Sequence, residues 1–367
     1  MAAPWTHTAY PQQIHFGAGA AGRAAQVLKD TGTRSWMVVT TAGRVASDDG
    51  RRLIDLLGRA VTSTFADVTA PLHTDTVEAA LRQARRDAVE GIVSFGGSTC
   101  ADLAKAVCFF AEHEAGTPGV SHADRPVIAH VAVPTTYSPC FLVPAFAMTD
   151  PQTRRTRAAG GPTLAPGAAI CDPDVVVSAP DTAAATGMVA LATAVGVVTQ
   201  PGAPPEARAV ALAAVQRAAA VLPYLADEPG EPAARGDLLT ATVLAGRARQ
   251  NTEAGLHHVL ATLLAGRGGV PYAPVAAALL PHVLRFNADV SPGWDVLGPA
   301  LGDPDDPAGA VERLLERTGL PRTLQACGVD PLELDAVAAL AAADPAIRTN
   351  PRPAGEADAR AILEDAL

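Results

Sequence analysis

The sequence predicts a parallel α/β domain followed by an all-helical domain. In the first half, short apolar runs alternate with segments of helical periodicity, as a parallel sheet with crossover helices requires. From Asp181 onward the chain is rich in Ala and Leu at helical spacing. Because 367 residues exceed what one hydrophobic core usually serves, we expect two domains, residues 1–178 and 179–367.

Apolar runs predict the strands, and amphipathic runs predict the helices of the first domain. We expect strands at 35–40, 91–95 and 127–133, a last extended piece at 174–177, and helices at 74–89 and 102–111. In the second domain, clusters of Gly and Pro separate the helices. These clusters lie at 200–206, 227–232 and 302–307.

Composition excludes several classes of protein. A net charge of −10 without a block of Lys or Arg argues against a nucleic-acid partner. Five scattered cysteines show no metal-type pairing and fit a reducing compartment. We see no apolar segment approaching the ~20 residues of a membrane span and no signal sequence. We therefore expect a cytoplasmic protein without a membrane partner, acting on a small molecule.

Two loops at the ends of predicted strands favour a dinucleotide site. Gly96-Gly97-Ser98 follows the strand at 91–95, and Thr135-Thr136 follows the strand at 127–133. Small and hydroxyl residues at the carboxyl ends of parallel strands leave backbone N–H groups available for phosphates. A structural alternative is a tight strand-to-helix turn without a ligand.

A second glycine-rich stretch, Gly17 to Gly22, matches the G-x-G-x-x-G pattern. The ribose-binding carboxylate expected about 20 residues later is missing, because the chain has Thr40-Thr41-Ala42 there. We therefore interpret this stretch as a tight turn and the Gly96 turn as the phosphate-binding candidate.

Several short motifs occur in a fixed order along the whole chain. They are Gly96-Gly97 with Asp102 and Lys105, Pro134-Thr135-Thr136-Tyr137, Asp172-Pro173-Asp174, Gly255-Leu256-His257-His258, Leu280-Pro281-His282-Val283 and Asn350-Pro351-Arg352-Pro353. Together they resemble the iron-containing alcohol dehydrogenase family, and the Pro-Thr-Thr-Tyr and Leu-His-His runs resemble its maleylacetate reductase branch. The resemblance implies a dehydroquinate synthase-like fold, with the active site in the cleft between the two domains, and a homodimer.

The resemblance also implies a set of cofactor-binding residues. By position they are Gly96, Gly97, Ser98, Asp102, Lys105, Thr135, Thr136, Ser138 and Arg155. Thr41 stands where alcohol dehydrogenases of the family often carry an Asp for the adenosine ribose, so either NAD or NADP is admissible. Arg155 replaces a Lys of the family, and a solvated surface charge is the alternative for it.

The metal site departs from the family pattern. Metal-using members hold the ion with an Asp, a His four residues later and two further His, and the matching positions here are Val189, Thr193, His258 and Tyr272. One imidazole does not hold a catalytic cation, so we expect no metal. We propose His258 as general acid, assisted by Tyr272 or His257. A core His beside a solvent His is the alternative.

These observations leave two hypotheses open. The first is a metal-independent NAD(P)H-dependent reductase of a small carbonyl, keto-acid or enone substrate, similar to maleylacetate reductase, in bacterial specialised or aromatic metabolism. The second is a family member without hydride transfer, either a non-redox lyase, isomerase or cyclase or a non-catalytic partner protein. The second gains weight from Pro139-Cys140-Phe141, which replaces the family's Gly-Ser-Glu.

Overall fold

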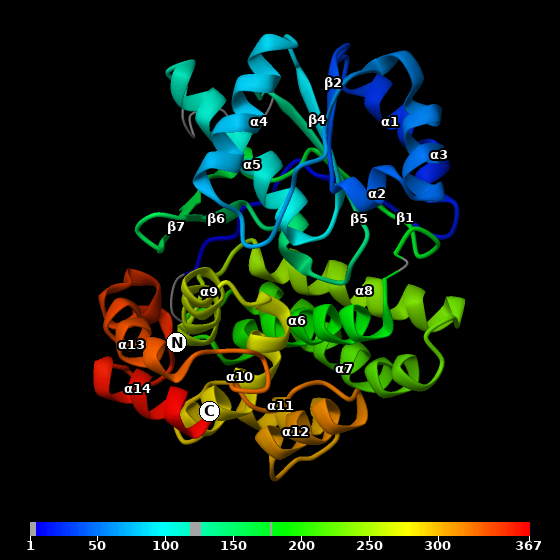
Figure 1. Cartoon of the computed structure of the whole chain (residues 1–367). Helices are drawn as coiled ribbons and strands as arrows, with labels where there is room; N and C mark the ends of the chain where they lie inside the picture. The colour runs from blue at the N-terminus through cyan, green and yellow to red at the C-terminus, as the bar shows by residue number, and fades with distance from the viewer. Residues whose placement is uncertain (1–4, 118–125, 177) are drawn as a thin grey trace. The chain divides into compact units, whose positions relative to one another are not determined.

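The computed structural model describes residues 5–117, 126–176 and 178–367 and contains both predicted architectures (Figure 1). One compact unit is the α/β unit, Ala9–Ser178. The other is the helical unit, which comprises Ala179–Leu367 and, of the described residues before Ala9, residues 5–8. The fold class predicted from the sequence is thereby confirmed. The beginning of the chain differs from expectation, because the Thr8 backbone N–H donates to Oδ1 of Asn251 at 2.6 Å within the helical unit.

The α/β unit is built on one six-stranded parallel sheet with the order β1-β8-β5-β4-β2-β3. Its strands are β1 Gln13–Phe16, β2 Trp36–Val39, β3 Val61–Phe65, β4 Gly91–Gly96, β5 Ala129–Pro134 and β8 Ala168–Cys171. Strands β2, β4 and β8 are buried throughout, which explains their continuous apolar runs.

Helices cover both faces of this sheet. They are α1 Ala24–Asp30, α2 Ala42–Val45, α3 Asp48–Leu57, α4 Thr74–Arg86 and α5 Ser98–Glu114. One apolar core joins α4 and α5 to Met37, Val39 and Ile92, and a second joins α1 and α3 to Val38 and Val93. Consecutive strand residues therefore point into opposite cores, as the two-residue period of a strand requires. Figure 1 shows α4 and α5 on one side of the sheet and α1 and α3 on the other.

The predicted extended piece at 174–177 is wrong. The strand is β8, and it ends at Cys171 because the Asp172 carboxylate accepts backbone hydrogen bonds from Gly19, Ala21 and Asp174 at 2.8–3.2 Å. Val177 lies outside the described residues. A two-stranded antiparallel hairpin, β6 Ala145–Asp150 with β7 Arg155–Gly160, was not predicted.

The helical unit contains nine α-helices among its described residues. They are α6 Pro180–Thr199, α7 Pro205–Asp227, α8 Pro232–Arg249, α9 Leu256–Gly268, α10 Tyr272–Asn287, α11 Trp294–Leu301, α12 Pro307–Arg317, α13 Leu334–Ala343 and α14 Glu356–Asp365. The three predicted Gly/Pro clusters lie at the boundaries of α6 with α7, α7 with α8, and α11 with α12. Pro begins α6, α7, α8 and α12, where its missing N–H is not needed.

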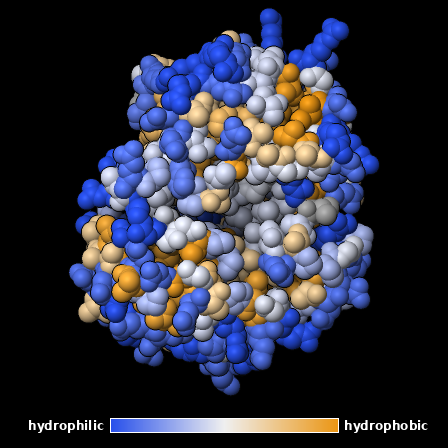
Figure 2. Space-filling model, viewed as in Figure 1, coloured by the Kyte–Doolittle hydropathy of each residue, from blue (hydrophilic) through white to orange (hydrophobic). Residues whose placement is uncertain are grey.

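Two of these helices correct the expectation that no segment approaches a membrane span. By length and hydropathy, α6 and α7 could each cross a bilayer. In α6, 78% of the apolar window is buried inside the protein, as in a central core helix, whereas in α7 the share is 39%. Figure 2 shows the face viewed in Figure 1 covered mainly by hydrophilic residues, with hydrophobic residues in small separate groups.

Candidate functional site

The turn from β4 into α5 leaves a helix N-terminus open. Gly97 is the N-cap residue of α5, and no side chain caps the helix there. A Cβ atom on Gly96 would collide with the Cys100 sulfur, so only glycine fits at this position. Unsatisfied N–H groups at the start of a long helix, with the helix dipole behind them, are suited to phosphate groups.

The Thr135–Ser138 loop lies beside this turn. The Thr135 backbone N–H donates to the Gly96 carbonyl at 3.0 Å. A Cβ on Gly97 would lie 3.3 Å from Cγ2 of Thr136, so the two loops approach closely. Thr135 and Ser138 are buried, while Ser98 and Thr136 are partly exposed. The structure therefore brings together the two loops that the sequence singled out.

Lys105 is buried and bonded to other groups of the protein. Its side chain is 0% exposed, and Nζ forms an ion pair with Oδ1 of Asp102 at 2.7 Å. The same ammonium donates to the carbonyl oxygens of Cys140 and Val143, at 3.0 and 3.3 Å, and of Ala145. Lys105 therefore ties the segment after the Thr135 loop to α5. The expectation that Lys105 contacts the cofactor stays a prediction, and in this structure the ammonium is bonded to groups of the protein.

The segment that replaces the family's Gly-Ser-Glu is also packed inward. Residues Pro139–Leu142 form a short 3-10 helix, in which Phe141 and Leu142 are buried. With the Cys140 carbonyl bound to Lys105, this segment is fixed to the core of the α/β unit.

Two other cofactor candidates belong to segments outside the Gly96 and Thr135 loops. Thr41 follows β2, which neighbours β4, and its hydroxyl accepts the Arg44 backbone N–H at 3.3 Å as the N-cap of α2. Arg155 begins β7 and is exposed, and it lines a cavity of about 140 Å³ with Arg157. Thr41 thus lies at the same sheet edge as the Gly96 turn, whereas Arg155 belongs to the β6–β7 hairpin.

The glycine-rich stretch at 17–22 already holds an anion of the protein itself. The Asp172 carboxylate, 2% exposed, accepts from the backbone N–H groups of Gly19 at 3.2 Å and Ala21 at 2.8 Å. A phosphate would compete with this carboxylate for the same donors. The prediction that residues 17–22 form a tight turn and do not bind the phosphates therefore has a physical reason, because Asp172 already occupies the N–H donors of this turn.

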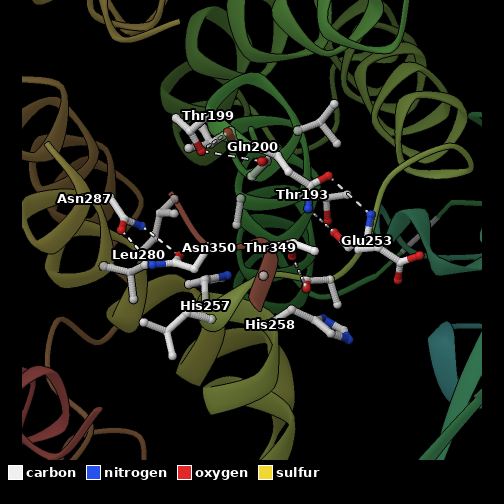
Figure 3. Close-up of a pocket in the computed structure, with 18 of the residues that line it drawn as sticks. Thr193, Thr199, Gln200, Glu253, His257, His258, Leu280, Asn287, Thr349 and Asn350 are labelled. Carbon is white, nitrogen blue, oxygen red and sulfur yellow. Dashed lines mark hydrogen bonds between the residues drawn. The ribbon is translucent and has the colours of Figure 1, made fainter. Parts of the chain in front are cut away.

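The helical unit contains a recess formed by α6, α8, α9, α10 and the 349–351 segment, with a volume of about 80 Å³ (Figure 3). Its polar lining consists of Thr193, Thr199, Gln200, Arg249, Glu253, His257, His258, Tyr272, Asn287, Thr349 and Asn350. His257 and His258, adjacent in sequence, point in different directions in Figure 3.

His258 and Tyr272 form a hydrogen-bonded pair across this recess. Nδ1 of His258 lies 2.9 Å from the Tyr272 hydroxyl, and the hydroxyl of Thr262 lies 3.5 Å from Nε2. Desolvation, the charge of Arg249 and His257 lower the pKa of His258 from its ordinary value of 6.5, while the side chain itself is exposed. An imidazole with an ordinary or a lowered pKa is mostly neutral at pH 7.

His257 is committed elsewhere. Its Nε2 lies 2.7 Å from the carbonyl oxygen of Ala276 and so fixes α9 against α10. Burial lowers the pKa of His257, which keeps this imidazole neutral as well. Of the three predicted catalytic side chains, the structure pairs His258 with Tyr272 and gives His257 a packing contact.

The donors at the family's metal positions do not fit a divalent cation. Val189 is 5% exposed within an apolar core, and the Thr193 hydroxyl donates to the Val189 carbonyl at 2.8 Å. Iron and zinc favour several imidazole, carboxylate or thiolate ligands, and His258 is the one imidazole of this set. Among the described residues, no group of three or more His, Cys, Asp or Glu is arranged to hold a metal ion.

Two sets of amide hydrogen bonds shape the recess, and the sequence analysis did not predict them. The Gln200 side chain donates to the Glu253 carbonyl at 2.9 Å and accepts the Glu253 backbone N–H at 3.2 Å. Asn287 and Asn350 exchange side-chain hydrogen bonds of 3.0 and 2.8 Å, drawn in Figure 3. Asn350 lies in the Asn350-Pro351-Arg352-Pro353 motif of the resemblance, which was the available signal, whereas Gln200 lies in a Gly/Pro cluster that indicated a loop.

The chain thus consists of a parallel α/β unit with a helix N-terminus open after β4, followed by a helical unit with a polar recess. Family models match residues 11–173, as iron-containing alcohol dehydrogenase, and residues 183–367, as the C-terminal part of that family. The chain belongs to the iron-containing alcohol dehydrogenase family.

Individual relatives and solved structures are similar to this chain over nearly its whole length. Maleylacetate reductase 2 of Cupriavidus pinatubonensis is 32% identical, covering 98% of this chain and 95% of that protein. The 4-hydroxybutyrate dehydrogenase of Cupriavidus necator is 30% identical, covering 98% and 99%. The crystal structure of maleylacetate reductase from Agrobacterium tumefaciens has the same fold, with a TM-score of 0.85, 24% identity and coverage of 100% and 98%. These relatives are oxidoreductases, which confirms the predicted enzyme class.

Proposed function

We propose that this protein is a metal-independent NAD(P)H-dependent reductase of a small carbonyl or keto-acid substrate. The observation that carries the proposal is the His258–Tyr272 hydrogen bond of 2.9 Å, at positions where other family members place metal ligands. Support also comes from the relatives, whose names identify them as a reductase and a dehydrogenase of organic acids. We further infer a cytoplasmic homodimer from the family resemblance.

The α/β unit supplies the cofactor site in this proposal. The open N-terminus of α5 binds the pyrophosphate, and Thr136 flanks it. Thr41 offers no carboxylate to repel a 2′-phosphate, so the proposal admits both NADH and NADPH. Bound cofactor supplies a hydride to the carbonyl carbon of the substrate.

The helical unit supplies the proton. When hydride adds to a carbonyl, the oxygen becomes an alkoxide that must be protonated. Neutral imidazole is a far weaker acid than a phenol, whose ordinary pKa is about 10, so Tyr272 is the immediate donor. His258 then stabilises the phenolate by donating from Nδ1, over the observed 2.9 Å contact. From the sequence we expected His258 to be the general acid, assisted by Tyr272 or His257. In this proposal Tyr272 donates the proton and His258 assists it.

Reduction assays with the Tyr272→Phe variant test this role. The change removes the donated proton but keeps the ring, so we expect kcat to fall by about 100-fold or more, in the range of general acid catalysis. Cofactor affinity, measured by nicotinamide fluorescence, should not change. Tyr224→Phe is the matched control, because Tyr224 is 50% exposed on α7 and does not line the recess.

Two results would contradict the proposal. If Tyr272→Phe retains full kcat, the pair is not the proton source. If the wild-type protein binds neither NADH nor NADPH, the chain belongs to the alternative class of family members without hydride transfer.

A further inference from the structure

Arg249 places a cation in the same recess as the His258–Tyr272 pair. It is the last residue of α8, and its Nη1 donates to the carbonyl oxygen of Thr252, which holds the side chain in position. Arg249, His258 and Tyr272 all line this recess, and all belong to the helical unit. The positive charge of Arg249 contributes, after desolvation, to the lowered pKa of His258.

Nothing in the described part of the chain neutralises this cation by direct contact. No carboxylate oxygen of a described residue forms an ion pair with Arg249. Glu253, on the same wall, acts on the guanidinium only through longer-range attraction. The side chain is partly buried, and burial is the main effect on its pKa, which it lowers. A partly buried cation that no carboxylate contacts directly is costly, so a site built in this way favours an incoming anion.

The planar fork of a guanidinium matches a carboxylate in particular, because two parallel N–H groups can each bond one oxygen. The recess is small, about 80 Å³, compared with the ~300 Å³ or more of sites for drug-sized ligands. It therefore suits one end of a short molecule, with its carboxylate at Arg249 and its carbonyl oxygen toward Tyr272.

We propose that Arg249 binds the carboxylate of the substrate, so that the enzyme reduces short aldehyde or keto acids in preference to neutral carbonyl compounds. This inference rests on the proposed function and names its substrate class. Arg249 has a second effect on the reaction, because its positive charge stabilises the phenolate left on Tyr272 after proton donation.

A substrate pair tests the inference. Succinic semialdehyde and its methyl ester differ in one negative charge, and we expect wild-type kcat/KM to be much higher for the acid. Arg249→Leu should lower kcat/KM for the acid about 100-fold, the effect of losing hydrogen bonds to a charged group. Arg249→Leu also removes the charge that stabilises the Tyr272 phenolate, and this effect should lower kcat for both substrates alike. The loss of the carboxylate contact should raise KM for the acid and leave KM for the ester unchanged.

Arg247→Leu is the matched control, since it removes the same charge two residues earlier on α8, outside the recess lining. Arg249→Lys should restore part of the preference for the acid, because a cation without the fork remains. Equal kcat/KM of the wild type for acid and ester, or an unchanged KM for the acid in Arg249→Leu, would overturn the inference.

A binding measurement separates this inference from the proposed function. Succinate, which carries the carboxylate but has no carbonyl to reduce, is titrated into cofactor-free protein by calorimetry. Loss of succinate binding in Arg249→Leu but not in Arg247→Leu supports the anion site even if no substrate is reduced. Equal succinate binding by both variants and the wild type rejects it, whatever the activity.

Discussion

Replacing Lys105 by Met tests the finding that this lysine fixes the segment after the Thr135 loop to α5. The ammonium is 0% exposed and contacts one carboxylate and three backbone carbonyl groups. Methionine has a similar length and fills the space, so the variant removes the charge and the donors while leaving little cavity. The Asp102 carboxylate and the carbonyl groups of Val143 and Ala145 then lose the bond from Lys105, whereas the Cys140 carbonyl keeps the Val143 backbone N–H, which donates to it at 3.0 Å.

The size of the effect follows from these contacts. An orphaned buried acceptor costs about 1–3 kcal/mol, and breaking a buried ion pair costs about 3–5 kcal/mol. Asp102 is 21% exposed and can take up water or a proton, which offsets part of the loss. We therefore expect the free energy of unfolding of the α/β unit to fall by about 3–5 kcal/mol.

Urea unfolding followed by Trp36 fluorescence measures this change. Trp36 is fully buried in β2, and replacing Trp5 and Trp294 by Phe makes the signal specific for the α/β unit. Lys29→Met, on the exposed side of α1, is the control with the same change of side chain. A Lys105→Met variant within about 1 kcal/mol of the wild type would refute this reasoning.

Two further predictions concern the α/β unit. Gly97→Ala should weaken NAD(P)H binding at least about 10-fold, because its Cβ lies 3.3 Å from Thr136 Cγ2 and crowds the phosphate approach; Gly22→Ala, where a Cβ meets nothing within 4 Å, should not. Fluorescence titration of both variants checks this, and the opposite order would assign the cofactor to the other glycine-rich turn. Burial, with a smaller contribution from Lys105, lowers the pKa of His130 from 6.5 to about 3. Between these pH values the unfolded chain binds a proton that the folded chain does not, so stability should fall as pH drops, by up to about 1.4 kcal/mol per pH unit. His130→Gln, which can keep the hydrogen bond to Ser94, should remove this part of the pH dependence in unfolding titrations; an unchanged slope would reject the assignment.

Much of the fold follows from local sequence signals. Buried parallel strands such as β4 are continuous apolar runs, and Gly/Pro clusters mark the ends of α6, α7 and α11 because both residues weaken a helix. Strand β8 was missed because Ala168-Ala169 carries weak strand propensity, and its pairing with β1 depends on residues more than 150 positions away.

The candidate site was only partly predictable. The Gly96 and Thr135 loops were found because small residues directly after a strand carry a local signal. The role of Lys105 was not predicted, because the sequence does not show whether a lysine on a helix contacts a ligand or the carbonyl groups of a loop 35 to 40 residues away. Asp172 in the turn at Gly19 and Arg249 beside Tyr272 likewise depend on tertiary contacts.

The most direct test of the central claim is the rate of NAD(P)H oxidation with a short aldehyde acid, before and after exhaustive chelation of the purified protein. If Tyr272 and His258 supply the proton without a cation, the chelated enzyme keeps its full rate, and added iron or zinc does not increase it. A rate that disappears on chelation and returns with one of these metals would contradict the account.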